Sequence, residues 1–94
     1  MKDKILNWAE ERNLLHSENA LKQYSKLQEE SNELLLSILN KDPYLQQDAL
    51  GDCFVVLIIL ANQLGHDLDK CLEMAYEEIK DRKGVTLNGN FIKN

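Results

Sequence analysis

Nine consecutive apolar residues, Cys-Phe-Val-Val-Leu-Ile-Ile-Leu-Ala at 53–61, constrain the fold most strongly. Helical spacing continues on both sides of this run, so it predicts one helix over residues 43–64, and the β-branched residues within it leave a buried strand as the rival interpretation. Asp42 before Pro43 favours the helix, because Asp accepts from the free first-turn amides and Pro is tolerated at the first position. A helix that is apolar on every face is covered by a bundle or by a partner subunit.

Composition predicts one small globular domain over residues 1–94. The chain is 44% hydrophobic, with 4 Gly and 1 Pro, which is too apolar for a disordered chain. A chain of this length buries only about two thirds of its unfolded surface, so we expect self-association. Cys53 and Cys71 form no C-x-x-C pair and are interpreted as small core residues of a cytosolic protein.

Charge and length exclude two classes of partner. The formal net charge is −5 and the basic residues are scattered, so no nucleic-acid-binding face is expected. The nine-residue apolar run is shorter than the ~20 residues of a membrane span, and no signal segment begins the chain. We therefore expect a cytoplasmic protein without membrane association.

Three further helices and a hairpin are expected. Amphipathic spacing predicts helices over residues 2–14 and 17–40, the second capped by Ser17. A fourth helix begins after Asp67 and is closed by Gly84. The apolar stripe of the second helix comprises Ala20, Tyr24, Leu27, Ser31, Leu34 and Ile38, and that of the fourth comprises Leu68, Cys71, Leu72, Ala75, Tyr76 and Ile79.

The tail contains Asn88-Gly89 between apolar pairs, which is typical of a tight two-residue hairpin turn. The fold class predicted is therefore all-α: an oligomeric four-helix bundle with a short C-terminal hairpin-like tail.

Acidic residues on the second and third helices are the candidates for chemistry. Glu30 and Glu33 lie about 60° apart on one helix, next to Glu29, and Asp48 and Asp52 lie one turn apart on the next. If these helices pack antiparallel, the acids form an oxygen-only cluster, which suits a hard cation such as Mg²⁺. The structural alternatives are a solvated face in which Lys26 pairs with Glu30, and a capped or water-bridged Asp52.

Three segments resemble the MazG-like all-α nucleoside triphosphate pyrophosphohydrolases, especially the short proteins of phages and Gram-positive bacteria. They are Lys-Leu-Gln-Glu-Glu-Ser-Asn-Glu-Leu at 26–34, Leu50-Gly51-Asp52 before the apolar helix, and Ala75-Tyr76 with Arg82. The resemblance implies Mg²⁺-dependent hydrolysis, with Mn²⁺ as a possible substitute, of an NTP or dNTP to the monophosphate and pyrophosphate. It also implies a homodimer or a dimer of dimers. Phosphoribosyl-ATP is the substrate of a related branch.

The family pattern E-E-x-x-E followed by E-x-x-D implies metal ligands at Glu30, Glu33 and Asp52. The remaining ligand position is Ala49, where the family usually has Glu. Asp48 or Glu29 would supply the missing oxygen, or would orient or deprotonate the attacking water. The alternative is a degenerate MazG-like bundle that binds a nucleotide or a protein partner without catalysis.

Substrate contacts are expected from five residues. Lys80 and Arg82 resemble the basic positions that family members use for phosphate, and Lys26 is a third candidate; their structural alternatives are a helix C-terminal charge and an ion pair. Trp8 and Tyr76 offer aromatic surfaces for a base, or are core residues. A di-iron bundle is excluded because the sequence has no Glu-x-x-His pair. A purely structural bundle leaves Asp52 without a role.

Overall fold

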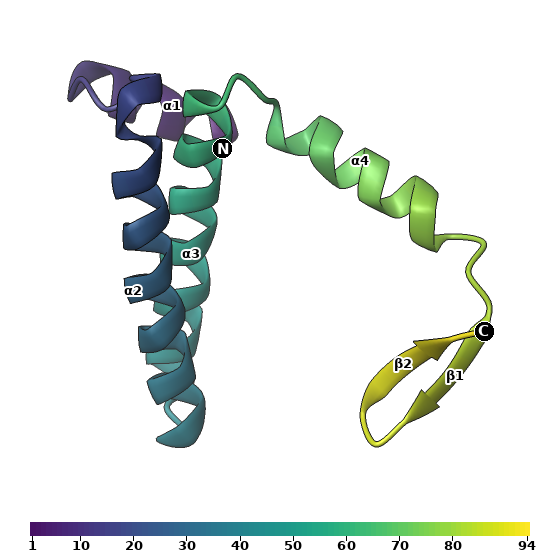
Figure 1. Cartoon of the computed structure of the whole chain (residues 1–94). Helices are drawn as coiled ribbons and strands as arrows, with labels where there is room; N and C mark the ends of the chain where they lie inside the picture. Colours follow the sequence, from purple (N-terminus) through teal and green to yellow (C-terminus); the bar gives the residue numbers. More distant parts are fainter.

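Two long antiparallel helices, α2 (Ala20–Leu39) and α3 (Pro43–Gln63), form the body of the molecule. The structure is a computed structural model that describes residues 1–94. Helix α1 (Lys2–Glu11) lies across one end of the pair, and a short 3₁₀ helix, η1 (Ser17–Asn19), leads into α2 (Figure 1). The helix predicted over the apolar run is confirmed, and the rival strand is not formed.

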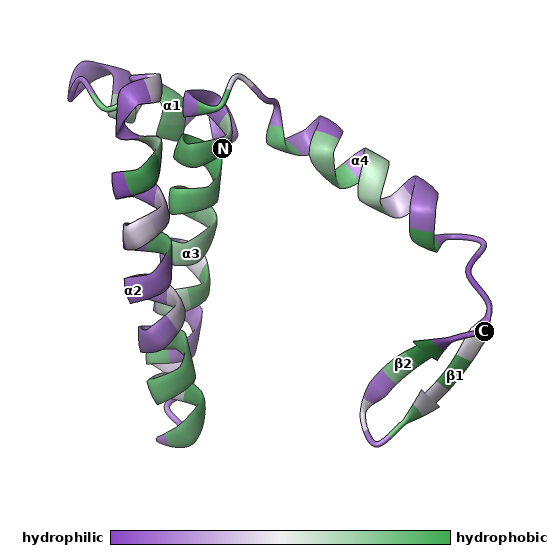
Figure 2. Ribbon diagram, in the orientation of Figure 1, coloured by the Kyte–Doolittle hydropathy of each residue, from purple (hydrophilic) through white to green (hydrophobic).

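Helix α3 starts as the Asp42-Pro43 pair predicts. The Asp42 carboxylate accepts from the Leu45 amide at 3.1 Å, and Pro43 occupies the first turn. Its buried side packs on α1 and α2, whereas Leu50, Phe54 and Leu64 are more than half exposed. Figure 2 shows apolar residues along much of its length. By length and composition α3 could cross a membrane, a test that the core helix of a soluble protein also passes.

The face that α2 turns to α3 is rotated from the predicted stripe. Glu30 and Ser37 are the buried residues of α2, while Tyr24 and Ile38 are about half exposed. Ser37 is 2% exposed, and its hydroxyl donates to the Leu34 carbonyl at 2.6 Å. A small side chain whose hydroxyl is hydrogen-bonded within its own helix lets the two helices approach closely. A polar residue therefore occupies a buried position at which hydropathy alone predicts an apolar residue.

The predicted start of the second helix is wrong. The Ser17 side chain caps nothing; Ser17 instead begins η1, and α2 begins three residues later. The backbone amide of Asn19 donates to the His16 carbonyl, so the main chain forms the turn that the side chain was expected to stabilise.

Helix α4 (Leu68–Ile79) projects away from the body (Figure 1), and none of its residues is buried. Asp67 caps it as predicted, accepting from the Asp69 amide at 3.0 Å. The helix ends at Ile79 rather than at Gly84, so Arg82 and Lys83 lie in the connection that follows it. The alternative interpretation of Arg82 as a charge within the C-terminal turn of this helix is therefore wrong.

The hairpin is confirmed. Strand β1 (Gly84–Leu87) pairs antiparallel with β2 (Asn90–Lys93). Asn88 and Gly89 form the turn, with φ of 51° and 80°, as a tight two-residue turn requires. The hairpin, rather than the end of α4, requires glycine at position 84, because a Cβ at this position would collide with the Ile92 carbonyl.

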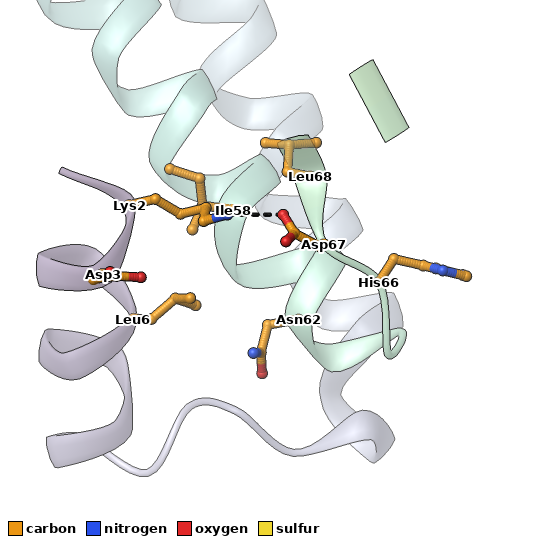
Figure 3. A pocket seen from close by; sticks show the side chains of 8 residues that line it. All are labelled: Lys2, Asp3, Leu6, Ile58, Asn62, His66, Asp67 and Leu68. Carbon is orange, nitrogen blue, oxygen red and sulfur yellow. Dashed lines mark hydrogen bonds and ion pairs between the residues drawn. The ribbon is translucent and has the colours of Figure 1, made fainter. Parts of the chain in front are cut away.

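One ion-pair cluster fixes the first turn of α4 to α1. The Lys2 ammonium lies 2.7 Å from Asp67 Oδ1 and 2.7 Å from Asp69 Oδ2. Figure 3 shows Lys2 and Asp67 joined at a hollow that Leu6, Ile58 and Asn62 also line. The hydrogen bond from Lys2 lowers the pKa of Asp67. We call this arrangement the Lys2 clamp.

Removing the Lys2 clamp should loosen α4 without unfolding the body. We expect Lys2→Ala to raise the hydrogen-exchange rate of the amides at residues 69–71, with little change in the unfolding free energy of the whole protein because the ion pairs are solvent-exposed. Lys4→Ala is the matched control, since the exposed Lys4 forms no ion pair. Equal exchange in the two variants would contradict a fixing role for Lys2.

Candidate functional site

Three carboxylates from α2 and α3 meet in the body, as the sequence predicts. Glu30, Glu33 and Asp52 each place an oxygen within 4.8 Å of the other two. We call these three residues the acid cluster. Opposite oxygens around an Mg²⁺ ion lie about 4.2 Å apart, so the cluster has close to the spread that a shared cation requires.

The buried carboxylate of Glu30 is the strongest sign that a cation belongs here. Glu30 is 8% exposed, and its Oε2 is buried without any hydrogen-bond donor. Its Oε1 lies 3.6 Å from the Lys26 ammonium, the ion pair predicted as the structural alternative. An unpaired buried carboxylate oxygen is costly, and a hard cation would remove that cost. The residues present therefore fit a divalent metal.

The pKa shifts of residues in and next to the acid cluster also agree with a metal site built from carboxylates. Partial burial, together with the charges of Asp48 and Glu30, raises the pKa of Asp52, while Lys26 opposes this shift. Burial and the neighbouring carboxylates also raise the pKa of the Cys53 thiol, which keeps it protonated and a poor metal ligand. The donors are thus carboxylate oxygens, the ligands that Mg²⁺ prefers.

Position 49 lies beside the acid cluster. Ala49 is 4% exposed and faces α2, where it lines a hollow of about 260 Å³ with Glu33, Ser37 and Asp48. Asp48 itself is exposed and also borders a second hollow with Asp52. A methyl group therefore sits where a fourth carboxylate would reach toward Glu33, and Asp48 is the acid next to that gap.

A larger hollow of about 500 Å³ opens next to the cluster, between α1, the start of α2, and α3. Trp8 and Lys26, both predicted for substrate, line it together with Lys22 and Gln63. Lys26 connects this hollow to the cluster, because its ammonium also contacts Glu29 at 3.4 Å and Glu30 at 3.6 Å.

Two lining residues, Trp8 and Gln63, supply an aromatic ring and a buried hydrogen-bond acceptor to this hollow. The Arg12 guanidinium lies 4.3 Å from the centre of the Trp8 ring, which is about half exposed. Gln63 donates from Nε2 to the Leu14 carbonyl at 2.7 Å, and its buried Oε1 has no donor. The sequence predictions missed Gln63; an amide placed after the apolar run is the signal that marks it.

The remaining predicted substrate residues do not join the cluster within one chain. Tyr76 is exposed on α4, Lys80 follows α4 and pairs with Glu77 at 2.8 Å, and Arg82 lies beyond the helix. Since α4 projects from the body (Figure 1), these residues lie away from the acid cluster. Glu29 is exposed beside Lys26, next to the cluster rather than within it. Roles for these residues stay predictions.

Residues 2–81 match the family model of phosphoribosyl-ATP pyrophosphohydrolase. The chain belongs to this family. The family lies within the superfamily of MazG-like all-α NTP pyrophosphohydrolases, whose fold the helices reproduce. It is a family of soluble, typically metal-dependent enzymes that act on nucleotide-like substrates.

One curated relative comes from Haemophilus phage HP1 (strain HP1c1), an uncharacterized 18.2 kDa protein in the rep-hol intergenic region. It is 44% identical over 69 residues, which cover 73% of this chain and 41% of the relative. The chain thus spans about two fifths of that relative. No solved structure matches the chain. The resemblance to the short phage type stays a prediction.

Neutralising Asp52 should stabilise the metal-free protein. Because the native pKa is raised, the native state binds the proton more tightly than the unfolded state, so stability falls as pH rises above the ordinary value of 3.8. We expect Asp52→Asn to raise Tm at pH 7 by about 2–4 °C. The gain should vanish below the ordinary value, where Asp52 is protonated in both states. Thermal unfolding with chelator, at both pH values, measures it.

Asp81→Asn is the matched control, because the exposed Asp81 lies outside the acid cluster and forms no ion pair. It should change Tm at neither pH. A Tm for Asp52→Asn that is equal to or below that of the wild type at pH 7 would contradict the burial and charge repulsion that raise the pKa of Asp52.

A carboxylate at position 49 should destabilise the metal-free protein and strengthen its response to metal. Ala49 is buried beside Glu33, so we expect Ala49→Glu to lower the unfolding free energy by about 1–3 kcal/mol in chelator. Added Mg²⁺ should raise Tm more than in the wild type, because the native state gains a ligand.

The variant Ala49→Gln separates charge from size. It brings nearly the same volume without the charge, so its Tm should fall without the added response to Mg²⁺. If the metal stabilises both variants equally, position 49 does not face a bound cation.

Proposed function

We propose that this protein is an Mg²⁺-dependent pyrophosphohydrolase that converts an NTP or dNTP to the monophosphate and pyrophosphate. The observation that carries the proposal is the buried Glu30 carboxylate, whose Oε2 has no hydrogen-bond donor, within a cluster of acids at the positions that the resemblance predicts. Such a carboxylate is explained by a cation that arrives with or before the substrate.

The acid cluster would hold the metal through Glu30, Glu33 and Asp52. When bound, Mg²⁺ neutralises charge on the phosphates and lowers the pKa of a water ligand. Asp48 and Glu29 are exposed at the edge of the cluster, where either carboxylate would accept the proton of the attacking water. Asp48 borders one hollow together with Ala49 and a second hollow together with Asp52, which supports Asp48 as the base.

The 500 Å³ hollow would receive the nucleoside. Its volume lies in the range of small-molecule sites, and the exposed Trp8 ring offers a face on which a base stacks. Gln63 Oε1 would accept a hydrogen bond from an N–H of the base, which would satisfy a buried acceptor. Lys26 stands between this hollow and the acids, where a phosphate chain would pass.

The proposed setting is a cytoplasmic homodimer or dimer of dimers in nucleotide-pool housekeeping, without nucleic-acid or membrane partners. Exposed apolar side chains on α3 and α4 support self-association, and a net charge of −5 disfavours binding to phosphate backbones. The second candidate function is binding of a nucleotide or a protein partner without turnover, which the missing carboxylate at Ala49 favours.

The test is product analysis with a panel of ordinary and modified NTPs, dNTPs and phosphoribosyl-ATP in Mg²⁺ or Mn²⁺. We expect monophosphate and pyrophosphate as products. Glu33→Gln should lower the rate at least about 100-fold, because it removes a ligand of the metal that neutralises charge in the transition state. Glu10→Gln, at an exposed position on α1, is the control and should keep full activity. Circular dichroism should show unchanged helix content in both variants.

Full activity in Glu33→Gln would remove the acid cluster from the reaction. A folded wild-type protein that binds a nucleotide but releases no pyrophosphate would favour the second candidate function.

A further inference from the structure

One face of α3 connects the acid cluster to the hollow of about 500 Å³ beside Trp8. Asp52, Val56, Ile59 and Gln63 follow one another on this face at intervals of three or four residues. Gln63 therefore lies only about 20° around the helix from Asp52, and about three turns or 16 Å further along its axis. A ligand that extends along this face would reach both the acids and Gln63.

Helix α2 supplies the opposite wall in the same direction. Lys26 and Lys22 precede Glu30 by about one and two turns, and both line the hollow. Because α2 and α3 are antiparallel, the two walls leave the acid cluster toward the same end of the body (Figure 1). Both lysines are exposed, so the charged groups of this wall lie at the mouth of the hollow.

The floor of the hollow is apolar except for one amide. Val56, Ile59 and Gln63 are its buried lining residues, and they all come from α3. Gln63 is 5% exposed, and the other two are aliphatic. No carboxylate lines the hollow. A ligand lying on this floor would therefore meet a single polar side chain.

The amide of Gln63 has a fixed orientation. Its Nε2 donates to the Leu14 carbonyl at 2.7 Å, so the nitrogen faces the connection after α1. Rotating the amide by 180° would break this bond and set Oε1 against the carbonyl, which places two acceptors in contact. Oε1 is therefore the atom left for a ligand, and no group of the chain donates to it. Side chains on a helix lean toward its N-terminus, which for Gln63 is the direction of the acid cluster.

A buried acceptor on the floor distinguishes bases by their outer edge. Cytosine and adenine carry an amino group there, which donates, whereas uracil, thymine and guanine carry a carbonyl, which accepts. Oε1 of Gln63 is buried, so a base that reaches it displaces part of the lining and then forms a hydrogen bond without replacing one to water. A base carbonyl at the same place would leave the oxygen without a donor.

We propose that Gln63 makes the hollow selective for nucleotides whose base carries an amino group at the edge opposite the sugar, over those that carry a carbonyl there. The favoured bases are cytosine and adenine. This inference rests on the proposed function for the position of the phosphates at the acid cluster, and it adds the class of base that the site accepts.

Binding of matched nucleotide pairs tests the preference without turnover. The α,β-methylene analogues of CTP and UTP, and those of ATP and ITP, exchange an amino group for a carbonyl and are not cleaved between the α- and β-phosphates. Trp8 is the single Trp of the chain and lines the hollow, so its fluorescence reports binding. In Mg²⁺ we expect the amino-bearing member of each pair to bind at least about 10-fold more tightly. Equal affinities, tighter binding of the carbonyl member or no binding at all would overturn the inference.

Substitutions test whether the amide is the cause. We expect Gln63→Leu to bring the affinity ratio of each pair close to 1, whereas Gln63→Glu keeps an acceptor and should keep the preference. A loss of stability lowers the affinity for both members of a pair alike, so the ratio reports recognition separately from folding. A preference that survives Gln63→Leu, or that Gln63→Glu abolishes, would overturn the role of Gln63.

Gln28→Leu is the matched control, because Gln28 is exposed on α2 and lies outside this hollow. It makes the same chemical change and should leave both ratios unchanged. A control that loses the preference as Gln63→Leu does would contradict recognition by the buried amide.

Product analysis separates this inference from the proposed function. Pyrophosphate released with equal kcat/KM from CTP and UTP would support the enzyme and contradict the selectivity. Selective binding of the analogues, with no pyrophosphate from any nucleotide, would contradict the proposed function and support the selectivity of the hollow.

Discussion

The close contact between α2 and α3 is the constraint on which the other features depend. Small residues, Ser37 on α2 and Ala49 on α3, are nearly inaccessible where the helices meet. This approach brings Glu30 and Glu33 opposite Asp52 and withdraws Glu30 from solvent. Burial of a carboxylate whose Oε2 has no hydrogen-bond donor costs stability, and the apolar side of α3 supplies the favourable burial that offsets it. The same contact therefore lowers the stability of the protein and brings together three carboxylates whose arrangement fits a cation.

Lys26 links the two halves of the proposed site. It pairs with Glu29 and Glu30 at the edge of the acid cluster, and its side chain also lines the hollow beside Trp8 and Gln63. The hydrogen bond and charge of Glu29, followed by the charge of Glu30, raise the pKa of Lys26, which keeps it cationic. In the proposed site, a metal ion held by the acids would leave the Lys26 ammonium free to bind a phosphate.

Local patterns predicted much of this fold. Asp42-Pro43, Asp67 and Asn88-Gly89 are each sufficient to mark a helix start or a turn, because their effect depends on neighbouring backbone groups. The hydropathy pattern predicted the wrong buried face for α2. Ser37 and Glu30 lie on the buried face because of their size and charge, and these matter only in contact with α3. Residue spacing predicted that the acids of α2 and α3 meet, and the family resemblance selected Glu30, Glu33 and Asp52 among them. Gln63 was not predicted, because its burial depends on the connection after α1. The path of α4 depends on the Lys2 clamp, which joins residues 65 positions apart.

The connection between α2 and α3 has only three residues, 40–42. Contacts across so short a loop lose little chain entropy on closing, and such local pairs form early in folding. Synthesis proceeds from the N-terminus, so residues 20–63 emerge from the ribosome before residues 68–94 do. Glu30, Glu33 and Asp52 can therefore come together while residues 68–94 are still inside the ribosome.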